Sequence, residues 1–171
     1  ALTPFWESVS AKGIYFAGTI MQASAGLKKN GIPSNSGAVN GHRYNAGVLA
    51  RHIARTHFGI EPPRPEIHRS DVVPLLMREL DHGPELWHQR SYLCRVVSVT
   101  PDEGIRDEGT LPLAHFVDAA GPDAVAVTIE PNASGQNYPA VYVRRGGGVS
   151  ERLLEPDERM AFDSPDRRAA L

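Results

Sequence analysis

Short apolar runs, separated by clusters of glycine and proline, follow one another along most of the chain. Residues 13–18, GIYFAG, form such a run and predict a buried strand that ends in a sharp turn at its glycine. Residues 35–59 carry apolar side chains at helical spacing, and Gly59 stands where a left-handed residue commonly ends a helix. We therefore expect a strand at 13–18, a loop over 19–34 and a helix over 35–59.

Three glycines, Gly37, Gly41 and Gly47, lie inside this predicted helix. In a helix interior each costs roughly 1 kcal/mol relative to alanine. We expect that some group approaches the helix backbone closely enough to offset this cost.

A proline-rich stretch, IEPPRPEIHR at 60–69, divides the chain into two unequal parts. Prolines at this density favour a stiff, extended backbone. We place a domain boundary there, with one unit at 1–59 and a second domain at 70–154. The charged tail at 155–171 is expected to form a loosely attached helix.

The second domain begins with helical patterning and continues with β patterning. A helix is expected from residue 70 to about residue 80, with one further turn over 85–89. The remainder is rich in Val, Ile and Tyr and is punctuated by turn clusters, which predicts an antiparallel sheet of about four strands. These strands are expected at 92–100, 111–118, 124–130 and 138–145, with a further short strand at 149–154. Alternating side chains in the 124–130 strand predict that only one of its faces is buried.

The charge balance gives no electrostatic reason to expect a nucleic-acid partner, because the formal net charge is -2. The basic pair Arg144–Arg145 is expected to lie in solvent. The acidic residues of the following group are also expected to be solvated: Asp102, Glu103, Asp107 and Glu108.

A single cysteine, Cys94, lies in an apolar run and is expected to be a buried strand residue. One cysteine forms no internal disulfide and no thiol zinc site, so the sequence favours a reducing, cytoplasmic compartment. No apolar stretch approaches the ~20 residues that span a bilayer, so we expect no membrane partner. No histidine pair has the i, i+4 spacing of a helical metal site, so no metal is expected.

The most informative local pattern is a strand, a glycine, a loop and a helix across 13–56. A strand that ends in glycine lets a ligand approach the backbone, and a helix N-terminus offers unpaired N–H groups and the positive end of a dipole. Such a place suits a phosphate or the reduced flavin N1–C2 carbonyl edge. A plain strand–helix unit of an α/β domain has the same spacing, so the pattern alone leaves both interpretations open.

The segment GIYFAGTIMQ, residues 13–22, resembles the second FAD-contacting motif of the pyridine nucleotide-disulfide oxidoreductase and flavin monooxygenase-like superfamily. There a strand of the type gvYfaGD ends beside the flavin ribityl chain. Residues 26–54 are similar to the last helix of that FAD domain, and the stretch through PELWHQRSYLCRVVSV resembles the C-terminal extension of bacterial FAD-dependent oxidoreductases. The resemblance implies an α+β chain in which 1–59 is the C-terminal remnant of an FAD-binding α/β domain, one strand plus one helix.

The resemblance also implies which residues contact FAD. These are the turn residues Gly18, Thr19 and Ile20 and the helix-start residues Ser36, Gly37 and Ala38. Where Thr19 stands, the family usually has an acidic residue that accepts from a ribityl hydroxyl. A threonine hydroxyl can hydrogen-bond there without charge assistance. His42 lies one turn into the helix, where a proton donor and a packing residue are both plausible roles. We expect no catalytic residue in this chain.

The chain contains no G-x-G-x-x-G after a strand, so the pyrophosphate cradle of FAD and the nicotinamide-binding domain would both lie upstream. We therefore expect a fragment that is inactive by itself and binds FAD weakly or not at all. In the intact enzyme, FAD would pass electrons between a nicotinamide nucleotide and a second substrate. The alternative is a non-catalytic α+β module for dimerisation or partner binding. A homodimer would cover the apolar residues of 14–16.

Overall fold

The computed structural model describes residues 1–23, 35–36 and 38–154. Its elements are, in chain order, the 3-10 helix η1 (Gly18–Ala23), β1 (Asn35–Ser36), α1 (Ala38–Phe58), the 3-10 helix η2 (Arg69–Asp71), α2 (Val72–His82), α3 (Pro84–His88), β2 (Gln89–Arg90), β3 (Leu93–Thr100), β4 (Gly104–Pro112), α4 (Leu113–Asp118), β5 (Asp123–Pro131), β6 (Asn137–Arg145) and β7 (Gly148–Leu153). Helices are combined with an antiparallel sheet, so the α+β class predicted from the sequence is confirmed. The predictions for Gly37, for residues 24–34 of the expected loop and for the tail at 155–171 lie outside the described residues. Residues 19–23, expected in the same loop, belong to η1.

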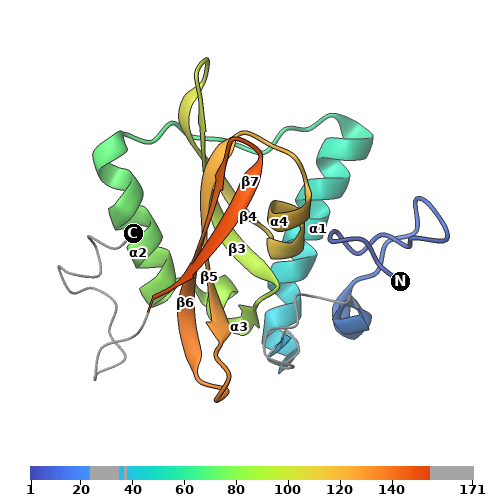
Figure 1. Ribbon diagram of the computed structural model, residues 1–171. Coiled ribbons are helices and arrows are strands. Elements are labelled where there is room, and N and C mark those ends of the chain that lie inside the picture. The colour runs from blue at the N-terminus through green and yellow to red at the C-terminus, as the bar shows by residue number, and fades with distance from the viewer. Residues whose placement is uncertain (24–34, 37, 155–171) are drawn as a thin grey trace.

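Five strands lie side by side in the order β4, β3, β5, β6, β7 and form one antiparallel sheet (Figure 1). The pairing of β3 with β4 shifts at one point, because Val96 lies opposite Gly109 and Val97 lies opposite Asp107. Glu108 is therefore the extra residue of a β-bulge, and Gly109 takes the φ of 75° that this irregularity requires. A bulge of this kind redirects a side chain out of the regular alternation of its strand.

The prediction of a strand at 111–118 is wrong. β4 occupies 104–112 instead, and α4 follows it directly. Pro112 has no N–H to continue the ladder, and it stands at the N-cap of α4. Leu113 and Phe116 lie one helical turn apart and are both buried. The apolar residues of this run thus form the buried face of a short helix, which a short run cannot distinguish from a strand.

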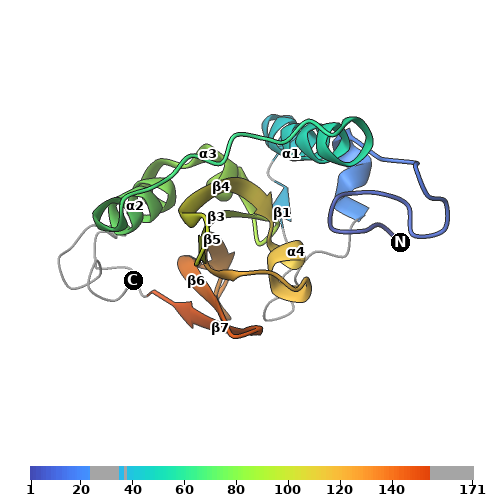
Figure 2. The same cartoon turned by 90° about the horizontal axis from the view of Figure 1, so that it is seen from above.

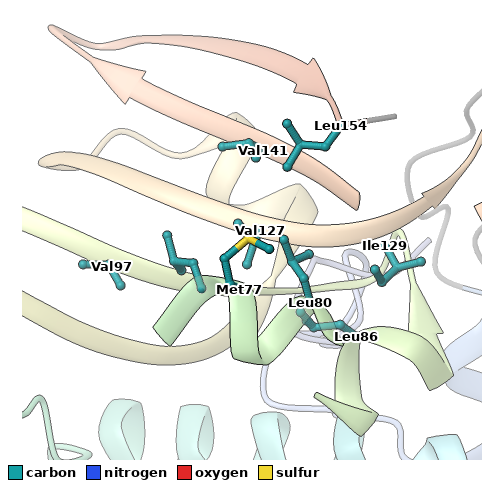
Figure 3. Close-up of a cluster of buried hydrophobic side chains, with 9 residues drawn as sticks. Met77, Leu80, Leu86, Val97, Val127, Ile129, Val141 and Leu154 are labelled. Carbon is teal, nitrogen blue, oxygen red and sulfur yellow. The ribbon is translucent and has the colours of Figure 1, made fainter. Parts of the chain in front are cut away.

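Both faces of the sheet are covered, whereas the alternation in 124–130 predicts one covered face. On one face α2 and α3 supply a cluster in which Leu80 lies against Val127 of β5 (Figure 3). On the other face α4 packs Phe116 against Ala126. The small side chain of Ala126 makes room for this second layer, so every position along β5 from residue 126 onward is buried.

Residues 13–18 do not form the expected strand. Tyr15 pairs with Glu7 in an isolated bridge, and Gly18 already begins η1. A strand needs a neighbour that satisfies its backbone groups, and no named strand in the described part of the chain lies beside this segment.

The helix predicted at 35–59 is confirmed as α1, which begins at Ala38, and Gly59 follows it with a φ of 66°. Figures 1 and 2 place η1 and the N-terminal segment beside α1, on the side away from α2. A third apolar cluster joins this segment and α1 to the start of β3, and its buried members are Trp6, Met21, Val48, Leu49, Tyr92 and Leu93.

The proline-rich linker is extended, as predicted, and it lies against the sheet. The N–H of Ile67 donates to the carbonyl oxygen of Ile105 at 3.0 Å, and the N–H of Asp107 donates to that of Pro65 at 3.0 Å. Figure 2 shows this segment passing along β4 on its way from α1 to α2. The linker thereby covers part of an edge strand whose backbone would otherwise face solvent.

Candidate functional site

The turn predicted to contact flavin lies on the surface. Gly18 has a φ of 80°, and a side-chain carbon built on it would meet no atom within 4 Å. Thr19 is exposed, and Ile20 is 49% exposed. The backbone of this turn can therefore be approached closely, which a residue larger than glycine at position 18 would impede.

Apolar packing against α1 holds the turn at residues 18–20 in place. Met21, at the centre of η1, is completely buried in the cluster that includes Val48 and Leu49 of α1. Trp6 belongs to the same cluster and is also buried. Residues 18–20 are thus fixed on the side of α1 without being covered by the sheet.

The second group of predicted flavin contacts lies at the start of α1. Ser36 pairs through its backbone with Gln89 in the short β1–β2 ribbon, and Ala38 is the first helical residue. The first turn of α1 contains no acidic residue, so none of its own side chains offsets the positive end of the helix dipole. His42, in this part of α1, is half-buried.

The close approach expected at the helix glycines is made by the protein itself. A side-chain carbon on Gly41 would lie 2.2 Å from Nε2 of Gln89 and 3.2 Å from the carbonyl oxygen of His88. Gln89 is fully buried, and its Oε1 accepts from Nδ2 of Asn45 at 3.0 Å. At Gly47 the nearest atom would be Nη1 of Arg51, at 3.8 Å. Gly41 therefore permits α1 to pack on α3 and β2, and no such contact exists at Gly47.

A second candidate site lies between the N-terminal segment, the linker and the sheet. It is a cavity of about 340 Å³, which we call the arginine cleft, and its main side chains are Phe5, Arg55, Arg64, Glu108, Leu111, His115, Phe116 and Arg144. A smaller cavity of about 210 Å³ lies next to it and shares Phe5, Arg55 and Leu111 with it. The cleft is therefore built by segments that are far apart in the sequence.

One wall of the arginine cleft is a strong ion pair between the linker and β4. Nε of Arg64 donates to Glu108 at 2.8 Å, and Nη2 donates to the other carboxylate oxygen at 2.7 Å. Burial raises the pKa of Glu108, but the hydrogen bonds from Arg64 and Ser98 outweigh this effect and leave the pKa below its usual range. The bulge at Glu108 aims this carboxylate at the linker, where it is neutralised.

Arg144 forms the floor of the cleft and is only 8% exposed. Its guanidinium donates to three backbone carbonyls: Nε to Pro122 at 3.0 Å, and Nη1 to Ala119 at 2.8 Å and to Phe116 at 3.2 Å. It also lies 4.5 Å from the centre of the Phe116 ring.

The expectation that Arg144, Asp107 and Glu108 are solvated surface residues is wrong. Arg144 and Asp107 are buried, and the Glu108 side chain is only 19% exposed. Asp107 is enclosed because it forms an ion pair with Arg95 of β3.

Aromatic rings close the side of the cleft next to α1. Phe5 stacks on His52 with ring centres 3.9 Å apart and lies 4.8 Å from His115. Burial lowers the pKa of His115, and the positive charge of Arg144 lowers it further. His115 is therefore neutral at pH 7 and can donate or accept a hydrogen bond there.

Sequence reasoning selected the turn at 18–20 and missed the arginine cleft. The cleft residues come from the N-terminal segment, α1, the linker, β3, β4, α4 with the loop after it, and β6, so no motif or fixed spacing joins them. Its one local signal is the irregularity at Glu108 and Gly109, where a glycine interrupts a strand pattern.

Other chemistry finds little support in the described part of the chain. No group of three or more His, Cys, Asp or Glu side chains could hold a metal ion there. Cys94 is fully buried, and burial raises the pKa of its thiol, so the reactive thiolate is disfavoured. None of the helices in the described part is both long enough and apolar enough to cross a bilayer.

Comparison with known proteins found no matching family model, no similar curated protein and no similar solved structure.

Proposed function

We propose that the chain is the C-terminal part of an FAD-dependent oxidoreductase and that it contributes one wall of the flavin site. The observation that carries this proposal is the exposed turn at Gly18, Thr19 and Ile20, which is fixed against α1. Its residues are those of the GIYFAGTI motif, and its backbone is open to a ligand. FAD would supply the electron-transfer chemistry.

The residues of this turn suit the ribityl part of a flavin. The absence of a side chain at Gly18 leaves space for close approach, and the exposed Thr19 hydroxyl can hydrogen-bond to a sugar-like hydroxyl. The N-terminus of α1, free of acidic residues, would stabilise negative charge on a reduced flavin ring. One side of the helix start is occupied by the protein itself, because Gln89 pairs with Ser36 and packs on Gly41.

Exposed apolar residues in the N-terminal segment also support the proposal, because they offer a surface that another part of an FAD domain could cover. Val9, Ile14 and Ile20 are 62%, 52% and 49% exposed. An exposed apolar patch commonly marks a surface that another element covers. In an intact flavoenzyme the remainder of the FAD domain would lie there.

Two experiments test the proposal. NMR titration of the chain with riboflavin, which has the ring and ribityl chain without the pyrophosphate, should shift the amide signals of 18–20 and 36–38. Thr19→Ala should weaken this response, and Ser10→Ala, an exposed hydroxyl outside the site, should not. Shifts confined to other residues, or none at saturating riboflavin, would sink the assignment.

The second experiment reads the coding sequence upstream of Ala1 and expresses the extended polypeptide. A glycine-rich dinucleotide fingerprint and a yellow protein are the expected results. In that protein Thr19→Asp, which restores the acidic residue of the family, should raise flavin retention. An upstream reading frame that lacks the dinucleotide fingerprint would favour the alternative, a non-catalytic interaction module.

A further inference from the structure

We propose that the arginine cleft binds a small monocarboxylate, with the carboxylate on Arg144 and an apolar body against Phe5 and Leu111. This inference goes beyond the flavin proposal and does not depend on it, because the cleft shares no residue with the turn at 18–20.

The first reason is that the Arg144 guanidinium is buried without a carboxylate partner among the described residues. This guanidinium is largely buried, and none of the described residues pairs a carboxylate with it. Its hydrogen bonds use Nε and Nη1, and Nη2 makes none to the described residues. A buried charge is costly unless it is paired, and arginine pairs best with a carboxylate or phosphate oxygen. The cleft therefore presents a donor that lacks its natural acceptor.

The second reason is the charge of the cleft as a whole. Three arginines and two glutamates line it. Arg55 lies 3.3 Å from Glu61, and Arg64 lies 2.7 Å from Glu108 and 3.0 Å from Glu103, so carboxylates offset the charges of both arginines. The charge of Arg144 remains, and the neutral His115 adds none. One guanidinium is thus available to an anion, and the carboxylates on Arg64 keep the surroundings from being strongly positive, which favours a monocarboxylate over a phosphate dianion.

The third reason is the shape and polarity of the remaining walls. Phe5, Leu111 and Phe116 offer apolar surface next to the guanidinium. The volume of about 340 Å³ lies at the lower end of the range of about 300–1,000 Å³ that is usual for small-molecule sites. His115, beside Phe5, can hydrogen-bond to the second carboxylate oxygen.

The test is calorimetric titration of the full chain with three probes: benzoate, benzamide and inorganic phosphate. Benzoate and benzamide have nearly the same shape and differ in charge, so we expect benzoate to bind at least about tenfold more tightly, because a charge-assisted hydrogen bond outweighs a neutral one. Arg144→Gln should weaken benzoate binding by roughly ten- to a hundredfold. Arg145→Gln, the exposed neighbour on β6, is the matched control and should leave it unchanged.

A second variant keeps the test decisive if Arg144→Gln does not fold. A side-chain carbon on Gly121 would lie 2.9 Å from Cζ of Arg144, so Gly121→Ala displaces the guanidinium without removing it. We expect this variant to weaken benzoate binding as well. Equal binding of benzoate and benzamide, preference for phosphate, or benzoate affinity unchanged in both Gly121→Ala and Arg144→Gln would overturn the proposal. Riboflavin-induced shifts at 18–20 report the flavin proposal separately, so failure of one leaves the other standing.

Discussion

Two glycines of α1, Gly41 and Gly47, allow a matched test of what the helix backbone contacts. The change is the same in both cases, glycine to alanine in one helix. In the absence of a contact, alanine stabilises a helix interior by about 0.5–1 kcal/mol relative to glycine. A new methyl group at Gly47 would meet only the end of Arg51 at 3.8 Å. Gly47→Ala should therefore raise the free energy of unfolding by about 0.5–1 kcal/mol.

At Gly41 the same gain is opposed by packing. The new methyl group would lie 2.2 Å from Nε2 of Gln89, so the amide must move. That movement threatens the buried hydrogen bond from Asn45 to Gln89, and leaving such a group unsatisfied costs about 1–3 kcal/mol. The new methyl group would also lie 3.2 Å from the carbonyl oxygen of His88, and this close contact adds to the destabilisation. We expect Gly41→Ala to lower the free energy of unfolding by a net of about 1–3 kcal/mol.

Urea denaturation followed by circular dichroism gives the free energy of unfolding of both variants and the parent, and thermal unfolding gives their Tm. For a chain of this length a change of 1 kcal/mol corresponds to a shift of about 2–4 °C in Tm. The two variants should move Tm in opposite directions. If both raise Tm equally, α1 does not pack on Gln89 as described, and the start of α1 has more open space for a ligand than the structure gives it.

Two further predictions concern the core and the ion pair. Leu80, on α2, is buried against the sheet, so Leu80→Ala should lower the free energy of unfolding by about 2–5 kcal/mol. Leu153, on β7, is 40% exposed, so Leu153→Ala should change this free energy by less than ~0.5 kcal/mol. Equal effects of the two substitutions in urea denaturation would contradict the packing of α2 on the sheet. The pKa of Glu108 is lowered in the folded state, so its stabilisation is present above the unfolded pKa of about 4.3 and is lost as the pH falls through the folded value. The urea midpoint of Glu108→Gln should therefore fall less between pH 7 and pH 3 than that of the parent, and an unchanged pH dependence would refute the role of the pair with Arg64.

The sequence alone determined the features that depend on neighbouring residues. The helical spacing before Gly59 predicted α1 and its end, and proline density predicted the extended linker. Alternation and turn clusters predicted β3, β5, β6 and β7 within a few residues. The motif at 13–22 selected a turn that proves to be exposed and fixed against a helix. In each case the signal is short-range, because backbone propensity and helix or strand periodicity extend over only a few residues.

Only the tertiary structure decided the rest. Residues 13–18 have the composition of a strand but have no neighbouring strand to pair with. Residues 113–118 form a helix because Pro112 ends β4, and the apolar face of this helix packs on the second face of the sheet. The burial of Arg144 and the pairing of Glu108 with the linker arise from contacts between segments that are 22 to 44 residues apart in the sequence. Such contacts are fixed by packing and charge in three dimensions, and the glycine at the bulge is their one local signal in the sequence.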